Sequence, residues 1–142
     1  MQRITNFQLV TSTHFFLIPV YYAYISYSYY FMLVYIMMYI GSVLYHSTND
    51  DTLHKFDIFT SRFGGLLTFI MYSMCNTNSC LPIILLHNTV TSYLLSRFTY
   101  NHTLCGGDNQ NCLNWIYFHM YFHLISSITW SFIVYDCKLS YI

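Results

Sequence analysis

Long apolar stretches separated by short polar segments organise this chain. The first stretch runs from residue 4 to about residue 46 without a single Asp, Glu, Lys or Arg. Forty residues in one helix would be about 60 Å long, twice the thickness of the hydrocarbon layer of a bilayer. Two helices joined by a tight turn fit better, and residues 26–28 are the most polar point of the stretch. We therefore predict helices over 8–25 and 28–46.

Three further apolar stretches follow, separated by polar segments at 47–55, 76–80 and 99–112. They predict helices over 56–74, 82–98 and 113–135, and Pro82 stands where a helix start tolerates proline. Runs of this length are too long for the strands of a membrane barrel. Because lipid cannot satisfy the polar backbone, the prediction is one all-α domain over 1–142, a transmembrane helical bundle of about five spans.

Composition excludes most soluble proteins. Of the 142 residues, 56% are hydrophobic and only 7% are charged, whereas a soluble domain has about 25% charged residues. The net charge of zero and the absence of a basic run give no reason to expect a nucleic-acid partner. The apolar run that follows Arg3 is also far longer than that of a cleavable secretory signal. We expect an integral, multi-pass membrane protein.

The basic residues indicate an orientation. Five spans would place the N-terminus and the two longer polar loops on one side of the membrane. Basic residues concentrate there: Arg3, Lys55, Arg97 and, close by, Arg62. Only Lys138 marks the other side. By the positive-inside tendency, the first side is cytosolic, while nothing in the sequence indicates the organelle.

The cysteines indicate little chemistry. The same count puts Cys75 and Cys80 on one side and Cys105 and Cys112 on the other, so these cannot pair across the bilayer. Neither spacing is that of a zinc knuckle. A Cys105–Cys112 bond would need an oxidising environment on a side that the basic residues mark as cytosolic, so we predict free thiols.

The histidines carry the strongest functional signal. His119 and His123 are four residues apart and share one face of the last predicted helix. Ser42 and His46 have the same spacing at the end of the second helix, and Asp57 begins the third. All three helix ends lie on the same side of the membrane by the count above. Three histidines that leave one coordination position open are typical of zinc hydrolases. Hydrogen bonding between helices is the alternative role for the pair.

Other polar residues in the helices have simpler interpretations. Arg62 is expected to extend its charge to the membrane surface or to pair with Asp57, and His54 is expected to lie in a loop without a role. His87 is expected to pack or to form a hydrogen bond. A small-residue face on the third helix predicts a close packing seam: Ser61, Gly64, Gly65 and Thr68.

Together these residues resemble a known superfamily. Ser42-Val-Leu-Tyr-His46, Asp57 and His119-Met-Tyr-Phe-His123 look like the S-x3-H, D and H-x3-H signature of the alkaline ceramidase superfamily. That superfamily includes the adiponectin and progestin receptors, the hemolysin III proteins, the GPI-remodelling phospholipases and the myomaker group. The resemblance covers residues 40–70 and 113–130. Its members have seven helices, so the resemblance implies that two are missing here between Asp57 and His119.

The resemblance implies a function. His46, His119 and His123 would bind Zn²⁺, Asp57 would act as general base or orient the attacking water, and Ser42 would stabilise the oxyanion. The implied activity is zinc-dependent hydrolysis of a membrane lipid amide or ester, ceramidase-like or phospholipase-like, with a zinc-activated water as nucleophile. The alternative is a non-catalytic multi-pass protein with a structural zinc site, in a receptor-like, membrane-remodelling or fusion role. A homo-oligomer would supply the wall left by the missing helices.

Overall fold

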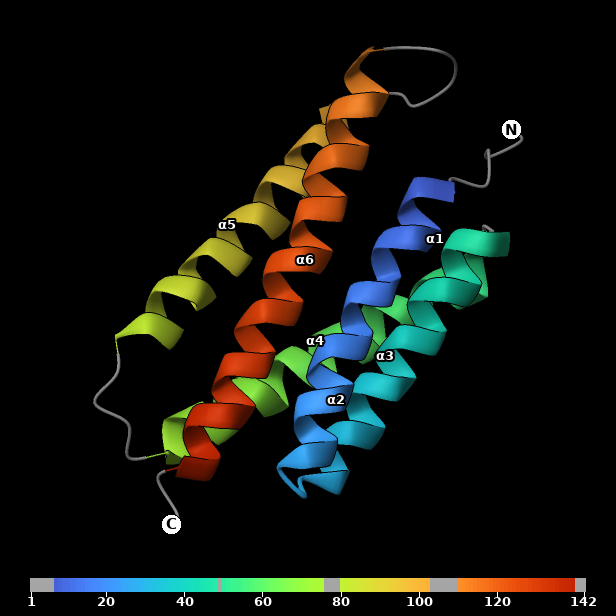
Figure 1. Cartoon of the computed structure of the whole chain (residues 1–142). Helices are drawn as coiled ribbons and strands as arrows, with labels where there is room; N and C mark the ends of the chain where they lie inside the picture. Colours follow the sequence, from blue (N-terminus) through green and yellow to red (C-terminus); the bar gives the residue numbers. More distant parts are fainter. Residues whose placement is uncertain (1–6, 49, 76–79, 103–109, 140–142) are drawn as a thin grey trace.

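The fold is all-α, as predicted. The computed structural model describes residues 7–48, 50–75, 80–102 and 110–139, and no strand occurs among them. Figure 1 shows the helices in chain order: α1 (Phe7–Thr13), the 3-10 turn η1 (His14–Phe16), α2 (Leu17–Ile25), α3 (Tyr29–Thr48), α4 (Asp51–Met74), α5 (Leu81–His102) and α6 (Gln110–Leu139). Since α1, η1 and α2 follow one another without a break, five helical rods lie at the five predicted positions.

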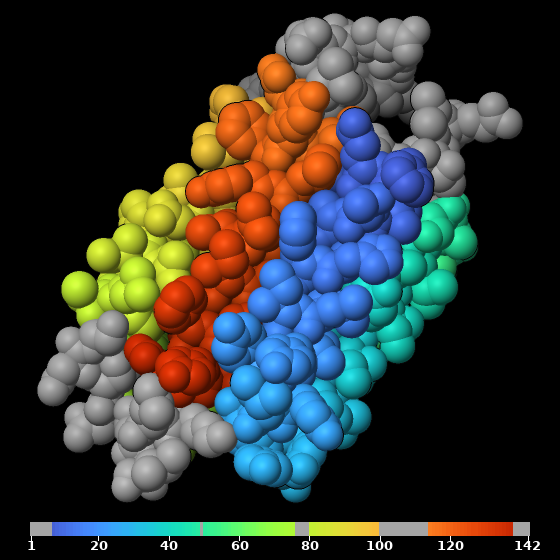
Figure 2. Space-filling model, viewed as in Figure 1, coloured from blue at the N-terminus to red at the C-terminus, as the bar shows by residue number. Residues whose placement is uncertain are grey.

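Helix α6 is the central element of the bundle. It packs against α5 on one side and against α1 and α2 on the other, as Figures 1 and 2 show. Helix α3 packs against α1, α2 and α4. Helix α4 contacts α3 and α6, but within the described residues it does not pack against α5. Helix α5 packs against α6 alone, so within the described residues the bundle is open between α4 and α5.

A proline explains the interruption of the first rod. Pro19 has no backbone N–H, and its ring crowds the carbonyl four residues earlier, that of Phe15. The chain tightens into a 3-10 turn at that point, from His14 to Phe16. A 3-10 turn of this kind is a common local response to strain in a helix.

The first predicted turn is confirmed. Residues 26–28 connect α2 to α3, and Tyr27 has a φ of 56°. The backbone N–H of Ser28 donates to the carbonyl of Ala23 at 2.9 Å. This bond satisfies one of the carbonyls that a helix end leaves unpaired.

The predicted loop over 47–55 is too long. Helix α3 continues to Thr48 and α4 already begins at Asp51. The Asp50 side chain caps α4 by accepting hydrogen bonds from the backbone N–H groups of Thr52 at 2.7 Å and Leu53 at 3.1 Å. These donors also hold the pKa of Asp50 below its ordinary value. The polar residues read as a loop are an N-cap and a first helical turn.

The other predicted loops are also shorter or lie outside the described residues. Helix α5 ends at His102 instead of 98, and α6 covers Gln110–Leu139 instead of 113–135. Residues 76–79, most of the predicted turn, and residues 103–109, which include Cys105, lie outside the described residues.

An aromatic stack forms the core of the bundle next to the histidines. Trp130 of α6 lies between Phe16 and Tyr35, with both ring pairs stacked at 5.6 Å between centroids. Tyr35 is fully buried, and its hydroxyl is hydrogen-bonded to Thr68 Oγ1 of α4 at 3.0 Å. The stack joins the first rod, α3 and α6, and the hydrogen bond connects α4 to it. These contacts set the relative positions of the helices that carry the polar site.

The small-residue face of α4 is a packing seam at Gly64 and Thr68, which are buried. A Cβ at Gly64 would collide with Met38 Sδ and lie 3.3 Å from Val34 Cγ1, both on α3. Gly65, on a different side of α4, has no atom within 4 Å of such a Cβ. The close approach of α3 and α4 thus depends on one glycine of the pair.

Gly64→Ala is expected to destabilise the protein by about 1–3 kcal/mol, because buried Met38 must move. Gly65→Ala is the matched control and should be neutral or stabilising by up to about 1 kcal/mol, since alanine favours a helix. Thermal unfolding of both variants in detergent measures the difference. Equal melting temperatures would show that α3 and α4 do not pack through Gly64.

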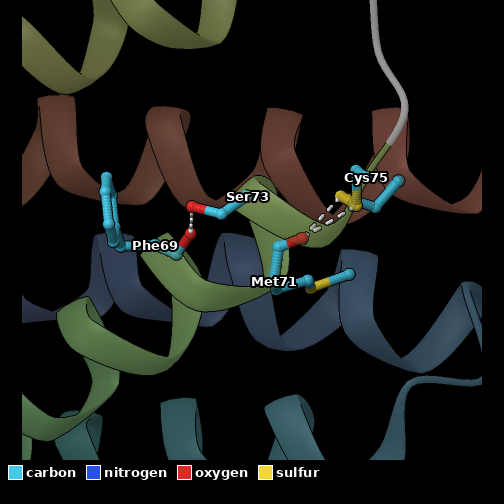
Figure 3. The surroundings of a disulfide bond; sticks show 5 residues. Phe69, Met71, Ser73 and Cys75 are labelled. Carbon is cyan, nitrogen blue, oxygen red and sulfur yellow. Dashed lines mark hydrogen bonds between the residues drawn. A yellow bond between two sulfur atoms is a disulfide. The ribbon is translucent and has the colours of Figure 1, made fainter.

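The prediction of free thiols is wrong for two cysteines. Cys75, at the end of α4, forms a disulfide with Cys137 of α6. Figure 3 shows the bond beside the Met71 carbonyl, which is 3.0 Å from Cys75 Sγ. The predicted topology already put the end of the third span and the end of the fifth on one side, and that was the signal available in the sequence. Cys80 is free and exposed.

One helix has the character of a membrane span on its own. Among the described helices, α3 alone combines the necessary length with a mean hydropathy of 1.3 over its apolar window. Large apolar side chains are nevertheless exposed on the other helices too, among them Leu17, Phe63, Leu66, Ile84, Leu94 and Phe132. Exposed apolar side chains are therefore found on every described α-helix, while a topology with five spans stays a prediction.

Candidate metal centre

Three histidines from two helices meet inside the bundle. His46 comes from the end of α3, and His119 and His123 come from successive turns of α6. Their nitrogen ligand atoms all lie within 4.8 Å of one another. The ring centroids are 5.2 Å apart for His46 and His119, and 4.6 Å apart for His119 and His123. This buried group can hold a metal ion.

Unpaired nitrogen atoms mark the centre of the group. Nε2 of His46 and Nε2 of His119 are buried and have no hydrogen-bond partner. His46 and His123 are each only 2% exposed. Buried polar atoms are nearly always hydrogen-bonded, because an unmet donor or acceptor loses its water without compensation. A cation between the rings would satisfy these nitrogens, so the donor set fits a metal such as Zn²⁺.

Serines orient two of the rings. Ser12 Oγ of α1 is 2.8 Å from His123 Nδ1 and donates its only proton to the carbonyl of Leu9. With that proton donated to Leu9, Ser12 accepts a hydrogen bond from the His123 tautomer that is protonated at Nδ1 and keeps its lone pair on Nε2. Ser96 Oγ of α5 is likewise 3.0 Å from His119 Nδ1. Contacts of this kind fix the ring orientation and tautomer that a metal needs.

Ser12→Ala is expected to weaken zinc binding about 10- to 100-fold, because His123 loses the acceptor that sets its tautomer. Competition with a chromophoric chelator measures the affinity. Thr11→Ala, an exposed change on the same helix, is the control and should bind zinc like the parent. Unchanged affinity in Ser12→Ala would show that the serine does not position the ring.

Asp57 and Ser42 lie beside the histidines. Asp57 of α4 is 8% exposed and lines a cavity of about 100 Å³ together with His119 and His123. Ser42, one turn before His46 on α3, lies near the Asp57 carboxyl group. Neither Ser42 Oγ nor Asp57 Oδ1 has a hydrogen-bond partner. The structure thus brings all five predicted site residues together. Four of them have a buried side-chain atom without a hydrogen-bond partner: an oxygen in Ser42 and Asp57, and Nε2 in His46 and His119.

The cavity lies where the bundle is open. Side chains of α4, α5 and α6 line most of it, with one residue of α3. Sequence reasoning did not assign several of them to a site: Tyr45, His54, Arg62, Tyr93, Ser96, Arg97 and Trp115. His54 is not in a loop, because α4 starts earlier than predicted, and its ring stacks on Tyr45 at 4.4 Å. No sequence spacing relates Ser12 or Ser96 to the histidines that they contact.

Arg62 and the His119/His123 pair each had an alternative predicted role. Arg62 lines the cavity without an ion pair to Asp57, and no salt bridge involves Arg62 or Arg97 within the part of the chain that is described. His119 and His123 do form hydrogen bonds between helices, but through Nδ1. Metal binding and hydrogen bonding between helices are therefore compatible, since each uses a different ring nitrogen.

No protein-family model, curated protein or solved structure matches the chain. The resemblance to the alkaline ceramidase superfamily rests on the motif residues alone and stays a prediction.

Proposed function

We propose that this chain is a zinc-dependent hydrolase that cleaves an amide or ester bond of a membrane lipid from within the bilayer. The observation that carries the proposal is the unpaired Nε2 atoms of His46 and His119 in a buried three-histidine group, with Asp57 on the same cavity. Three histidines bind zinc and leave a coordination position for the reaction.

The outer surface supports a location in the membrane. The five helical rods contain between 19 and 30 residues, and about 20 residues cross a bilayer. Exposed apolar side chains lie along the rods, where a soluble protein of this size would carry charge. On this proposal the histidine site lies toward the cytosolic side, and the Cys75–Cys137 disulfide lies toward the opposite, oxidising side.

The cavity suits a reacting group more than a whole lipid. Its volume of about 100 Å³ is below the roughly 300–1,000 Å³ of pockets that enclose a drug-sized ligand, so it takes a reacting group and water but not acyl chains. Because α4 and α5 do not pack together, the chains can remain outside, between these helices. Lipid or a second copy of the chain would then take the place of the two helices that the seven-helix proteins have in addition.

The residues divide the chemistry between them. Zinc, when bound, supplies a Lewis acid that activates water and polarises a carbonyl group. Asp57 Oδ1 has no competing hydrogen bond and can accept a proton from the attacking water. Ser42 Oγ is also unpaired and can donate a hydrogen bond to the oxygen on which negative charge develops. Ser12 and Ser96 hold the two α6 rings in place.

The test combines metal analysis with a lipid assay. The protein is purified in detergent without chelator, its zinc is measured, and fatty-acid release from fluorescent ceramide and fluorescent phosphatidylcholine is followed. We expect about one zinc per chain, as in sites with three histidines, and release that stops after chelation and returns with zinc. A folded, zinc-loaded protein that releases no fatty acid from either lipid would contradict the proposal.

A further inference from the structure

Two arginines from different helices line the cavity. Arg62 belongs to α4 and Arg97 to α5, and both side chains line the cavity that contains Asp57, His119 and His123. Both are exposed. We propose that these arginines bind the phosphate group of a phospholipid, so that the substrate is a phosphate-bearing lipid ester and not a neutral ceramide. This rests on the proposed function, because the same cavity is taken to receive the ester.

The arginines are placed close to the reacting group. Arg97 follows Ser96, whose hydroxyl contacts His119, so it lies at the level of the histidines. Arg62 comes five residues after Asp57, which is about 7.5 Å along the helix axis. Both positive charges therefore border the cavity that contains His119 and His123.

The charge of the cavity favours an anion. Among the described residues that line it, Asp57 is the one carboxylate, against the two arginines. Neither arginine has an ion-pair partner within the described residues. Arg62 belongs to the helical part of α4 and not to a loop. An unpaired charge within a membrane span is costly, and a lipid phosphate supplies the missing partner.

The chemistry of phospholipids fits this spacing. Their phosphate is attached to the same three-carbon glycerol unit as the two acyl esters, so the anion and the reacting carbonyl lie a few ångströms apart. A guanidinium group binds phosphate oxygens with two parallel hydrogen bonds. Arg62 and Arg97 together can hold the phosphate while the ester reaches the histidine group. A ceramide has no anionic group to pair with them.

Binding is measured apart from hydrolysis. The whole chain in detergent is titrated with dihexanoyl phosphatidic acid, dihexanoylglycerol, hexanoate and inorganic phosphate, and the fluorescence of Trp115, which lines the cavity, reports binding. Arg62→Gln and Arg97→Gln are compared singly and together. Lys55→Gln is the matched control, because Lys55 is an exposed cation of the same helix that does not line the cavity.

We expect the parent to bind phosphatidic acid at least about tenfold more tightly than the other three probes, and each arginine variant to lose about tenfold, the effect of a charge-assisted hydrogen bond. Lys55→Gln should stay within about twofold, since a surface charge contributes little. Equal binding of dihexanoylglycerol, tighter binding of hexanoate or free phosphate, or an equal loss in Lys55→Gln would each overturn the inference.

The outcomes separate this inference from the proposed function. Selective binding of phosphatidic acid without any hydrolysis would leave the phosphate site standing and remove the enzyme. If the protein hydrolyses ceramide and neither Arg62→Gln nor Arg97→Gln changes the rate, the enzyme would stand and the phosphate site would be removed. Thermal unfolding of each variant identifies a loss of binding that comes from misfolding, and Arg97→Lys, which keeps the charge, should recover part of the affinity.

Discussion

Replacing His123 with alanine is expected to reduce the bound zinc from about one ion per chain to almost none. His123 is held in place on two sides, since its Nδ1 contacts Ser12 and its ring lies 5.0 Å from that of Phe16. Two remaining histidines cannot hold zinc as three can. Elemental analysis of the purified variant measures the loss, and His46→Ala, on another helix, should give the same result.

Stability measurements separate metal loss from misfolding. Zinc at 1,000 times its dissociation constant stabilises a protein by about 4 kcal/mol, so chelation should lower the melting temperature of the parent markedly. The same chelation should leave His123→Ala unchanged. His87→Ala, an exposed change on α5, is the control and should keep both the zinc and the chelator effect. A His123→Ala protein that retains a full equivalent of zinc would refute the three-histidine site.

Asp57→Asn should abolish hydrolysis while the zinc remains. Removing a general base lowers the rate about 10²- to 10⁴-fold, and the amide of asparagine has nearly the size of the carboxyl group. Asp57 Oδ1 has no hydrogen-bond partner, so no hydrogen bond to that oxygen is lost. Fatty-acid release per zinc ion, measured at saturating lipid, gives the effect.

Asp51→Asn provides the matched control for Asp57→Asn. It makes the same chemical change on the same helix at an exposed position, and should leave the rate within about twofold, as is usual for surface substitutions. Hydrolysis by Asp57→Asn at more than a tenth of the parent rate would exclude Asp57 as the base. If the parent itself binds zinc without hydrolysing lipid, the ion would have a structural role joining α3 to α6.

Helix number and position followed from local patterns. Each apolar run is long enough for a helix, and the polar point at 26–28 and Pro82 mark where helices end or begin. The boundaries at 47–55 and 99–112 were less accurate, because polarity does not distinguish a capped helical turn from a loop. Asp50 shows the difference, since its side chain begins a helix inside a segment as polar as any loop.

The site was only partly readable in the same way. The spacing of His119 and His123 puts them on one face of any helix, and the topology count brought His46 and Asp57 to the same end of the bundle. The disulfide between Cys75 and Cys137 was compatible with that count. Pairing depends on a distance between two helices, however, and the count gives only the side on which each helix ends.

The lengths of the apolar runs were enough to indicate five helices, and the four-residue spacing together with the count of spans indicated a group of three histidines near Asp57. Tertiary packing was needed to place Ser12 against His123, 111 residues away, and to bring Arg62 and Arg97 to one cavity. Residues three or four apart share a helix face whatever surrounds the helix. Contacts between helices depend on how each one is tilted and rotated, and here the Trp130 stack and the Gly64 seam determine that arrangement.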